Sequence, residues 1–569
     1  MAPETAGGAE RPEVNVLVGG EAGQGLVTVG RLLAKSLVRS GYHILVTQDY
    51  QSRIRGGHNT FGVRAGVAPV RAPAEGVDLL VALDGATVAL HRPELRPGGL
   101  VVADAAAGVQ VEPGLEVPFA ELAPAQAANV AALGVAAAVL GLDLEVVAGA
   151  VSDLFGAKHP EAAEANRRAL AAAHAWAVER GAAGAVRLAP PEPAPDRLML
   201  NGNEAIAYGA LSAGLRFLAF YPMTPSTSVA LTVAAHARDL GVMVEQAEDE
   251  IAAVNMAIGA SFAGAPAMVT TSGGGFALME EGVSLAAMTE TPLVVVVAQR
   301  PGPATGLPTR TEQGDLDLVL HAGHGEFPRA ILAPGTVEEC FELTHKAFHL
   351  AELAQGPVFV LTDQFLADSD RAVAPFDLAA LRPVEPGAGV MPPGGSYRRY
   401  EVTENGVSPR LLPGLTPALV VADSDEHTPD GHITEDLGVR VRMVDKRLRK
   451  AGLLRAETVP PEYQGPEDPD LLLVAWGSTG GAAVEAAEAL TAGGRPAAVL
   501  RFRQVWPLVP EQFSDRCRRA REVICVEGNA TGQFERLLRC EAGVRVSRSV
   551  RRYDGRPVTP GYILRALGA

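Results

Sequence analysis

Tyr221-Pro222-Met223-Thr224-Pro225-Ser226 opens the stretch that decides the fold, which extends to Asp315. It follows the apolar run Phe217–Tyr221, and the apolar runs Ala267–Thr271 and Leu293–Ala298 also end in glycine-rich or polar turns. Apolar runs of four to six residues without polar alternation are typical of strands in a parallel sheet that is covered on both faces. The stretch therefore predicts an α/β domain whose turns gather at one edge of a sheet, where α/β proteins assemble their sites.

The same strand–turn–helix pattern occurs before and after this domain. Val14–Val18 runs into a glycine turn and an expected helix over 26–37. Later strands are expected at Ala418–Ala422, Leu471–Ala475, Ala497–Arg501 and Glu522–Glu527. We therefore predict three α/β domains with mainly parallel sheets. Their expected bounds are 1–188 for the first domain, 189–197 for a proline-rich linker, 198–371 for the second domain, 372–415 for a connector and 416–569 for the third domain.

Composition excludes several classes of protein. The net charge of −17 argues against a nucleic acid or an anionic membrane as partner of the whole surface. No secretory signal pattern opens the sequence and no apolar run is long enough for a membrane span, so we expect a cytoplasmic protein. The four cysteines, which show no CxxC or zinc spacing, read as buried or incidental thiols, so we expect no iron–sulfur cluster in this chain.

A candidate acid lies at the start of an apolar helix. Glu250 directly precedes the run 251–260, whose packing would bury the first helical turn and thus the carboxylate. Glu248 and Asp249 compete for any role that Glu250 has. A simpler interpretation is that all three acids only favour the positive end of the helix dipole.

A candidate anion-binding residue follows the third strand of the stretch. Arg300 would stand at the carboxyl edge of the sheet, and a guanidinium in a dry cleft is a natural bidentate partner for a carboxylate. Arg310 is the rival for this role, or it contacts a partner chain. Pro222 and Pro225 lie on either side of Thr224 and fix its backbone, although a threonine between prolines is usually a turn residue.

Taken in this order, the acid, the hydroxyl and the arginine resemble the pyrimidine-binding domain of 2-oxoacid:ferredoxin oxidoreductases, which depend on thiamine diphosphate. The resemblance implies that Glu250 hydrogen-bonds the aminopyrimidine N1′ and that Arg300 holds the substrate carboxylate. It further implies that Thr224 and Thr309 lie near the substrate, with Arg310 as a second substrate residue. The resemblance also implies that the cofactor is bound, besides Glu250, by Tyr221, Pro222, Ser272, Gly273 and Gly274. The family commonly has Ser-Gly-Pro-Gly where this chain has Ser272-Gly273-Gly274-Gly275, a departure that leaves the backbone donors in place.

The two flanking domains resemble other parts of the same enzymes. The N-terminal domain resembles their gamma domain, and Gly23, Gly25, Arg53 and Arg55 would then bind coenzyme A, unless the arginines are only structural. The C-terminal domain resembles the transketolase C-terminal-like domain. Its segment Asp430-Gly431-His432 has the residue types of a metal site, but a polar loop at a subunit contact is the better interpretation, and we expect no metal bound by this chain.

Two motifs of these enzymes are absent from the sequence. There is no Gly-Asp-Gly segment for Mg²⁺ and the cofactor diphosphate, and no cysteine set for a cluster. The resemblance thus implies a beta subunit that supplies Mg²⁺ and a [4Fe–4S] cluster, in an (αβ)₂ heterotetramer that reduces ferredoxin. The expected reaction converts a 2-oxoacid, with 2-oxoglutarate preferred, and coenzyme A into acyl-CoA and CO₂. The alternatives are a pyruvate or broad-specificity enzyme, a non-redox thiamine enzyme, and a non-catalytic protein that binds coenzyme A.

Overall fold

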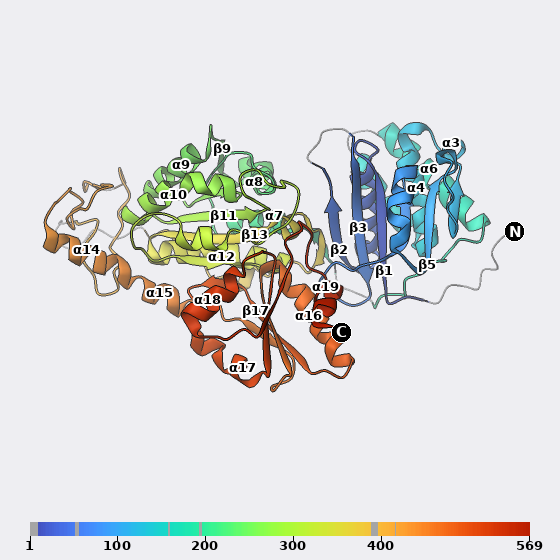
Figure 1. The fold of residues 1–569 in the computed structure, drawn as a ribbon. Coiled ribbons are helices and arrows are strands. Elements are labelled where there is room, and N and C mark those ends of the chain that lie inside the picture. The colour runs from blue at the N-terminus through green and yellow to red at the C-terminus, as the bar shows by residue number, and fades with distance from the viewer. Residues whose placement is uncertain (1–9, 52–55, 157–159, 193–195, 388–396, 416) are drawn as a thin grey trace. The chain divides into compact units, whose positions relative to one another are not determined.

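The computed structural model describes residues 10–51, 56–156, 160–192, 196–387, 397–415 and 417–569, and Figure 1 shows their fold. The chain forms two compact units. The first comprises the described residues of Met1–Leu200 with Asp368–Phe376 and Thr559–Gly561. The second comprises Asn201–Ala367, the described residues of Asp377–Val558, and Tyr562–Ala569.

The first unit is built on an eight-stranded sheet in the order β6-β5-β4-β1-β3-β2-β14-β7. The pairs β1–β4, β4–β5 and β5–β6 are parallel, whereas β3 pairs antiparallel with both β1 and β2. The strands are β1 (Glu13–Glu21), β2 (His43–Asp49), β3 (His58–Gly66), β4 (Val77–Ala82), β5 (Leu95–Asp104), β6 (Gly114–Val117), β7 (Leu198–Leu200) and β14 (Arg371–Val373).

Helices cover this sheet in layers. The helix α4 is apolar on all sides, because it packs against the strands on one side and against α6 on the other. The helices of this unit are α1 (Leu26–Arg39), α2 (Gly85–His91), α3 (Phe119–Leu122), α4 (Ala128–Leu140), α5 (Leu144–Phe155) and α6 (Pro160–Glu179).

The second unit contains a seven-stranded sheet in the order β18-β12-β13-β11-β10-β8-β9. All its neighbouring strands pair in parallel except β12 and β18. The strands are β8 (Phe217–Phe220), β9 (Met243–Gln246), β10 (Ala267–Thr271), β11 (Leu293–Gln299), β12 (Ala330–Leu332), β13 (Pro357–Asp363) and β18 (Gln504–Trp506). The central strands are apolar and fully buried, as expected for a sheet with helices on both faces.

In Figure 1, α9 and α10 lie on one side of this sheet and α12 lies on the other. The helices around the sheet are α7 (Gly202–Ser212), α8 (Thr227–Leu240), α9 (Glu250–Phe262), α10 (Gly273–Met288), α11 (Leu316–His321), α12 (Val337–Ala354) and α13 (Gln364–Asp368). The carboxyl ends of β8, β9, β10 and β11 carry the turns discussed below.

A five-stranded sheet completes the second unit, in the order β15-β17-β16-β19-β20. Its apolar core is continuous with that of the seven-stranded sheet. The strands are β15 (Glu462–Gln464), β16 (Leu471–Trp476), β17 (Ala497–Phe502), β19 (Glu522–Glu527) and β20 (Arg548–Arg551). The helices are α14 (Leu437–Arg449), α15 (Ala451–Ala456), α16 (Gly480–Ala492), α17 (Ser514–Arg519), α18 (Gln533–Ala542) and α19 (Pro560–Leu567).

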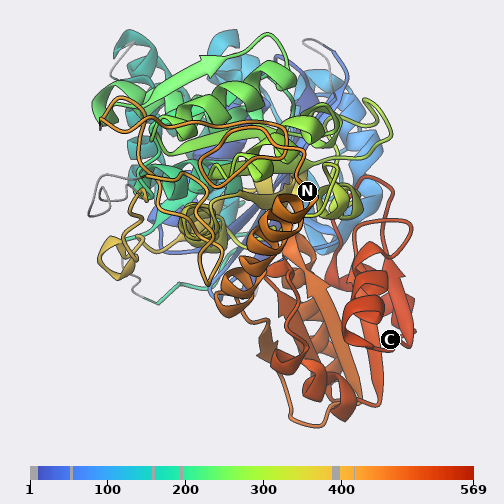
Figure 2. The same cartoon turned by 90° about the vertical axis from the view of Figure 1, so that its left-hand side faces the viewer.

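The helix α14 stands at the left-hand margin of this unit in Figure 1 and so lies toward the viewer in Figure 2, and it is fastened by a buried ion cluster. Lys446 of α14 donates to the Glu290 carboxylate at 2.6 Å, and Lys450 forms a second ion pair with the same group. Arg399 donates to the Glu290 carbonyl at 2.7 Å. All four side chains are buried, so the Glu290 carboxylate is the counter-ion on which the buried cations around it depend.

Three α/β sheets confirm the predicted fold class, with a first sheet that is mixed rather than mainly parallel. One expected strand is wrong. Residues 418–422 form no strand, and Leu419 among them is 79% exposed. Residues 418–422 precede α14, and no strand of the three described sheets pairs with them. Within the described part of the chain, no helix combines the length and the apolarity needed to cross a bilayer.

Candidate active site

Four turns meet at one edge of the seven-stranded sheet. The strands β9, β8, β10 and β11 are parallel neighbours, so their carboxyl ends lie side by side. Tyr221-Pro222 follows β8, and Glu250 begins the helix after β9. Ser272-Gly273 follows β10, and Arg300 follows β11. The topology therefore brings together the acid, the glycine turn and the arginine that the sequence placed far apart.

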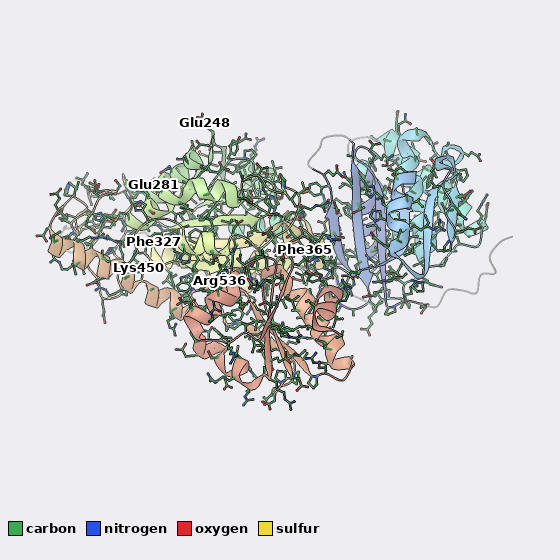
Figure 3. The ribbon with its side chains drawn as sticks, viewed as in Figure 1. Glu248, Glu281, Phe327, Phe365, Lys450 and Arg536 are labelled. Atoms are coloured by element: carbon green, nitrogen blue, oxygen red, sulfur yellow. The ribbon has the colours of Figure 1, made fainter. Side chains whose placement is uncertain are left out.

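Glu250 is the buried member of the three neighbouring acids. It begins α9 and is 3% exposed, whereas Glu248 is exposed at the outer edge of the unit (Figure 3). Asp249 caps the helix, because its carboxylate accepts a hydrogen bond from the amide of Ala252 at 2.7 Å. The three acids thus have three different environments, and helix capping explains only Asp249.

The Glu250 carboxylate is poorly solvated and incompletely bonded. Burial raises the pKa of Glu250, and the nearby Asp249 charge adds to this effect. Across the described chain, no hydrogen-bond donor reaches Glu250 Oε1. A buried acceptor without a partner is costly by about 1–3 kcal/mol, which is a reason to expect a ligand donor at this oxygen.

Two glycines of the turn at the start of α10 have no room for a side chain, because carboxyl groups lie against them. A Cβ atom on Gly275 would overlap Glu250 Oε1 and Thr271 Oγ1 and would lie 2.7 Å from Glu250 Cδ. A Cβ atom on Gly273 would lie 2.6 Å from Cγ of Asp315. Gly274 is exposed, and the nearest atom to its Cβ position is the Ala304 carbonyl oxygen at 3.7 Å. Only the middle glycine is therefore replaceable, the position where the resembling family has proline.

Arg300 is anchored to the turn that follows β8. Its Nη1 donates to the Thr224 carbonyl at 2.6 Å, so the backbone of Thr224, rather than its hydroxyl, makes this contact. Burial lowers the pKa of Arg300, while the charge of Asp315 acts in the opposite direction. A half-buried guanidinium with donors to spare fits a ligand carboxylate.

The remaining predicted residues of this site lie at different depths. Tyr221, Pro222 and Thr224 are exposed, and Ser272 is buried with no partner for its hydroxyl among the described residues. Thr309 and Arg310 are half-buried on the loop after Arg300. The Arg310 side chain lies 3.0 Å from the Cβ position of Gly555, a residue of the C-terminal part of the unit.

Sequence reasoning missed Asp315 and the residues that position it. The Asp315 amide donates to the Gln299 side-chain oxygen at 2.9 Å, and the Gln299 side-chain amide donates to the Thr362 carbonyl at 3.1 Å. Gln299 also directly precedes Arg300, so it connects the arginine and the acid. An aspartate just before a short apolar helix was the available signal, and it reads at first as an ordinary cap.

The predicted anion site of the first unit is only partly described. Gly23 and Gly25 have φ angles of 103° and 77° at the turn before α1, and Arg53 and Arg55 lie outside the described residues. Beside this turn, Nε2 of His58 lies 2.7 Å from Nε2 of His91. Burial lowers the pKa of His58, and His91 adds to this effect. Within the described ranges, no group of three His, Cys, Asp or Glu side chains has an arrangement that could hold a metal ion.

The site has features that suit thiamine diphosphate. The unpartnered Glu250 oxygen suits a donor on the aminopyrimidine ring, and the glycine turn lets a ligand approach the backbone closely. Both observations concern this chain's own residues, and neither involves its flanking domains.

Three family models match successive parts of the chain. Residues 208–446 match the family model of the thiamine diphosphate-binding domain of pyruvate flavodoxin/ferredoxin oxidoreductase. Residues 15–176 match the model of pyruvate ferredoxin/flavodoxin oxidoreductase, and residues 463–538 match the transketolase C-terminal domain.

Similar proteins span its length as well. The alpha subunit of 2-oxoacid:ferredoxin oxidoreductase 2 from Aeropyrum pernix is 33% identical over 96% of this chain and 96% of that protein. The 2-oxoglutarate synthase subunit KorA of Methanothermobacter marburgensis is 32% identical over 65% of this chain and 98% of that protein. The structure of 2-oxoglutarate:ferredoxin oxidoreductase from Magnetococcus marinus, with 2-oxoglutarate, coenzyme A and succinyl-CoA bound, matches with a TM-score of 0.92 and 31% identity. That match covers 98% of this chain and 99% of that one.

The family models and the full-length relatives point to the same kind of enzyme subunit. Because the identity to the Aeropyrum pernix protein extends over nearly the full length of both proteins, the chain belongs to the family of 2-oxoacid:ferredoxin oxidoreductase alpha subunits.

Proposed function

We propose that this chain is the alpha subunit of an enzyme that oxidises 2-oxoglutarate with coenzyme A to succinyl-CoA and CO₂ and passes the electrons to ferredoxin. The observation that carries the proposal is the buried Glu250 carboxyl, with one unpartnered oxygen, on the same sheet edge as Arg300. The choice of 2-oxoglutarate is supported by the ligands of the Magnetococcus marinus enzyme.

In the proposed site, thiamine diphosphate supplies the electron sink that makes loss of CO₂ from a 2-oxoacid possible. Glu250 shares a proton at Oε1 with a nitrogen of the aminopyrimidine ring, a role that its raised pKa suits. Ser272, Gly273 and Gly274 line the approach to the cofactor, with Tyr221 and Pro222 at its outer side.

Arg300 binds the substrate carboxylate in this proposal. Its anchor on the Thr224 carbonyl fixes the guanidinium, so little orientation is lost when a carboxylate binds. Thr224 and Thr309 supply hydroxyls near the substrate, and Arg310 is the second substrate residue.

The proposal divides the labour between subunits and domains. A beta subunit supplies the Mg²⁺ site and the [4Fe–4S] cluster, in an (αβ)₂ assembly. Coenzyme A uses the gamma domain, residues 1–188, through Gly23, Gly25, Arg53 and Arg55. The linker at 189–197, the pyrimidine-binding domain at 198–371, the connector at 372–415 and the transketolase C-terminal-like domain at 416–569 complete the assignment.

Co-expression with the beta subunit tests the proposal. We expect a brown complex that reduces a viologen dye when 2-oxoglutarate and coenzyme A are both present. Pyruvate is the second candidate substrate, because the matching family models are named for it. Dye reduction with pyruvate but not with 2-oxoglutarate would make pyruvate the substrate. A complex that reduces the dye with neither acid would contradict the proposal.

Arg300→Ala in the same complex tests the substrate residue. Removing the charge partner of a desolvated carboxylate should cost about 2–5 kcal/mol in kcat/KM. The loss should be equal for pyruvate and 2-oxoglutarate if Arg300 holds the carboxylate that both share. A loss confined to 2-oxoglutarate would move Arg300 to the distal carboxylate, and unchanged values for both would remove it from the site.

A further inference from the structure

Asp315 places a second carboxyl, with one buried oxygen, beside the glycine turn. Glu250 lies against Gly275 at one end of the turn, and the Asp315 carboxyl lies against Gly273 at the other. In the described chain, Asp315 Oδ2 is buried and accepts no hydrogen bond. The turn therefore separates two acids that each have an unpartnered oxygen.

A structural role does not explain this carboxyl. Asp315 stands at the N-cap position of α11, yet its side chain makes no capping hydrogen bond. Other groups hold the loop. The Gln313 amide donates to the Gly528 carbonyl at 2.7 Å, and the Gln533 side chain donates to the Gly314 carbonyl at 2.7 Å. The side chain of Asp315 is free for another purpose while its backbone is fixed.

The charged groups that act on Asp315 come from two directions. Burial and, after it, the charge of Glu312 on the same loop raise the pKa of Asp315 to about 6, against a smaller opposing effect of Arg300. From α10 the facing residue is Gly273, from β11 it is the neutral Gln299, and from α18 the neutral Gln533 contacts the loop. Glu250 is the other acid at this turn, beside Gly275. Asp315 is thus the acid whose charge acts on Arg300.

We propose that Asp315 is a positioning residue for substrate, which opposes a 2-oxoacid carboxylate at Arg300 when it is ionised and takes up a proton when that carboxylate binds. The inference rests on the proposed role of Arg300. The proton comes from solvent, adds to the Asp315 carboxylate, and returns to solvent when the substrate carboxylate leaves the site. No bond of the substrate is made or broken in this step.

The linkage has a definite sign. A bound carboxylate is a second negative charge near Asp315 and so raises its pKa further. Substrate then binds more tightly at low pH, where Asp315 is already protonated. Each unit by which the bound carboxylate raises the pKa of Asp315 corresponds to about a tenfold weaker affinity at high pH than at low pH.

The experiment measures KM and kcat for 2-oxoglutarate in the assembled complex between about pH 5.5 and 7.5, a range in which the carboxylate next to its oxo group stays ionised. Wild type is compared with Asp315→Asn, Glu312→Gln and Asp317→Asn. Asp317 lies in the first turn of α11, directly after the loop, and is ion-paired with Arg536, which Figure 3 labels. Asp317→Asn therefore controls for loosening of this segment. The isosteric Asp315→Asn keeps the shape at Gly273.

We expect the wild-type KM to rise by about tenfold or more across this range. In Asp315→Asn, KM should stay at its low-pH value throughout. Glu312→Gln should keep the rise but shift its midpoint to lower pH, because one negative neighbour of Asp315 is gone. Asp317→Asn should keep the wild-type profile. A merely structural role for Asp315 would not move the midpoint in Glu312→Gln.

A pH-dependent rise of KM that persists in Asp315→Asn would overturn the inference. So would a higher KM in Asp315→Asn than in wild type at the high-pH end. These results differ from a failure of the proposed function, which would appear as no dye reduction by the wild-type complex, and from a failure of the role of Arg300, which would appear as unchanged kcat/KM in Arg300→Ala. If Arg300→Ala weakens substrate use but Asp315→Asn keeps the pH dependence, only the role of Asp315 is wrong.

Discussion

The Glu250 carboxylate occupies the space that a side chain on Gly275 would need. Oε1 of Glu250 overlaps the Cβ position of Gly275, and Glu250 Cδ lies 2.7 Å from it. Close packing of this kind gives the acid a rigid mount in apolar surroundings, two conditions for a carboxyl that holds a proton near neutral pH. The same contact makes the glycine turn a test of the site.

Gly275→Ala should displace Glu250 and lower kcat by about 10²-fold, the usual size of a general acid–base contribution. Gly274→Ala is the matched control, because its Cβ meets only the Ala304 carbonyl oxygen at 3.7 Å. Steady-state dye reduction by the two complexes checks this. Equal losses in both variants would mean that the turn is sensitive to any side chain, and no loss in Gly275→Ala would contradict the placement of Glu250.

Asp315→Asn should stabilise the protein at neutral pH. The pKa of Asp315 is about 6 in the folded chain and ordinarily 3.8, so the folded state binds the proton more tightly. Wild-type stability therefore falls as pH rises from about 4 through 6, by at most about 3 kcal/mol, and the neutral variant escapes this loss. Thermal unfolding midpoints at pH 4 and 7.5 should differ between the two proteins only at pH 7.5. A variant that is less stable than wild type at pH 7.5 would count against a destabilising charge.

Glu290→Gln should destabilise the second unit strongly. The ammonium groups of Lys450 and Lys446 outweigh burial and lower the pKa of Glu290 to about 2, and removing its charge leaves both lysines buried without a counter-ion. The expected cost is about 3–5 kcal/mol. Because the folded-state pKa is depressed, the stabilisation is present above about pH 4.5 and is lost as pH falls towards 2.

Thermal unfolding of Glu290→Gln at pH 7 measures that cost. The exposed Glu248→Gln is its control and should unfold like wild type. An unfolding midpoint in Glu290→Gln equal to that of the control would show that the buried cluster does not fasten α14.

The purified single chain should be colourless and inactive. Cys340 and Cys525 are buried, and Cys517 and Cys540 lie on α17 and α18. Iron analysis and the visible spectrum of the chain without its partner provide the check. A stoichiometric iron–sulfur spectrum would contradict the proposed division between subunits.

Sequence reasoning predicted the parallel strands of the second unit closely, because each is a short apolar run buried on both faces. Leu293–Ala298, for example, lies within β11, and Ala267–Thr271 is β10. It missed the antiparallel β2 and β3, whose polar residues weaken the apolar signal. It also placed a strand at 418–422, because an apolar run does not reveal whether another strand lies beside it.

The candidate site followed the same division. Glu250 and Arg300 could be predicted because each directly follows a strand, and topology then brings strand ends together. Asp315 could not, because its importance depends on a contact with Gly273 across 42 residues of sequence and on burial by a loop. The structure also separated Glu248, Asp249 and Glu250, which the sequence left as rivals.

The comparison of Glu250→Gln with Glu248→Gln tests the central claim most directly. A neutral amide cannot hold the proton that the carboxyl holds, so kcat for dye reduction with 2-oxoglutarate and coenzyme A should fall by about 10²-fold or more in Glu250→Gln. Assembly with the beta subunit should be retained, and Glu248→Gln should behave as wild type. Activity retained in Glu250→Gln and lost in Glu248→Gln would contradict the assignment of the buried acid.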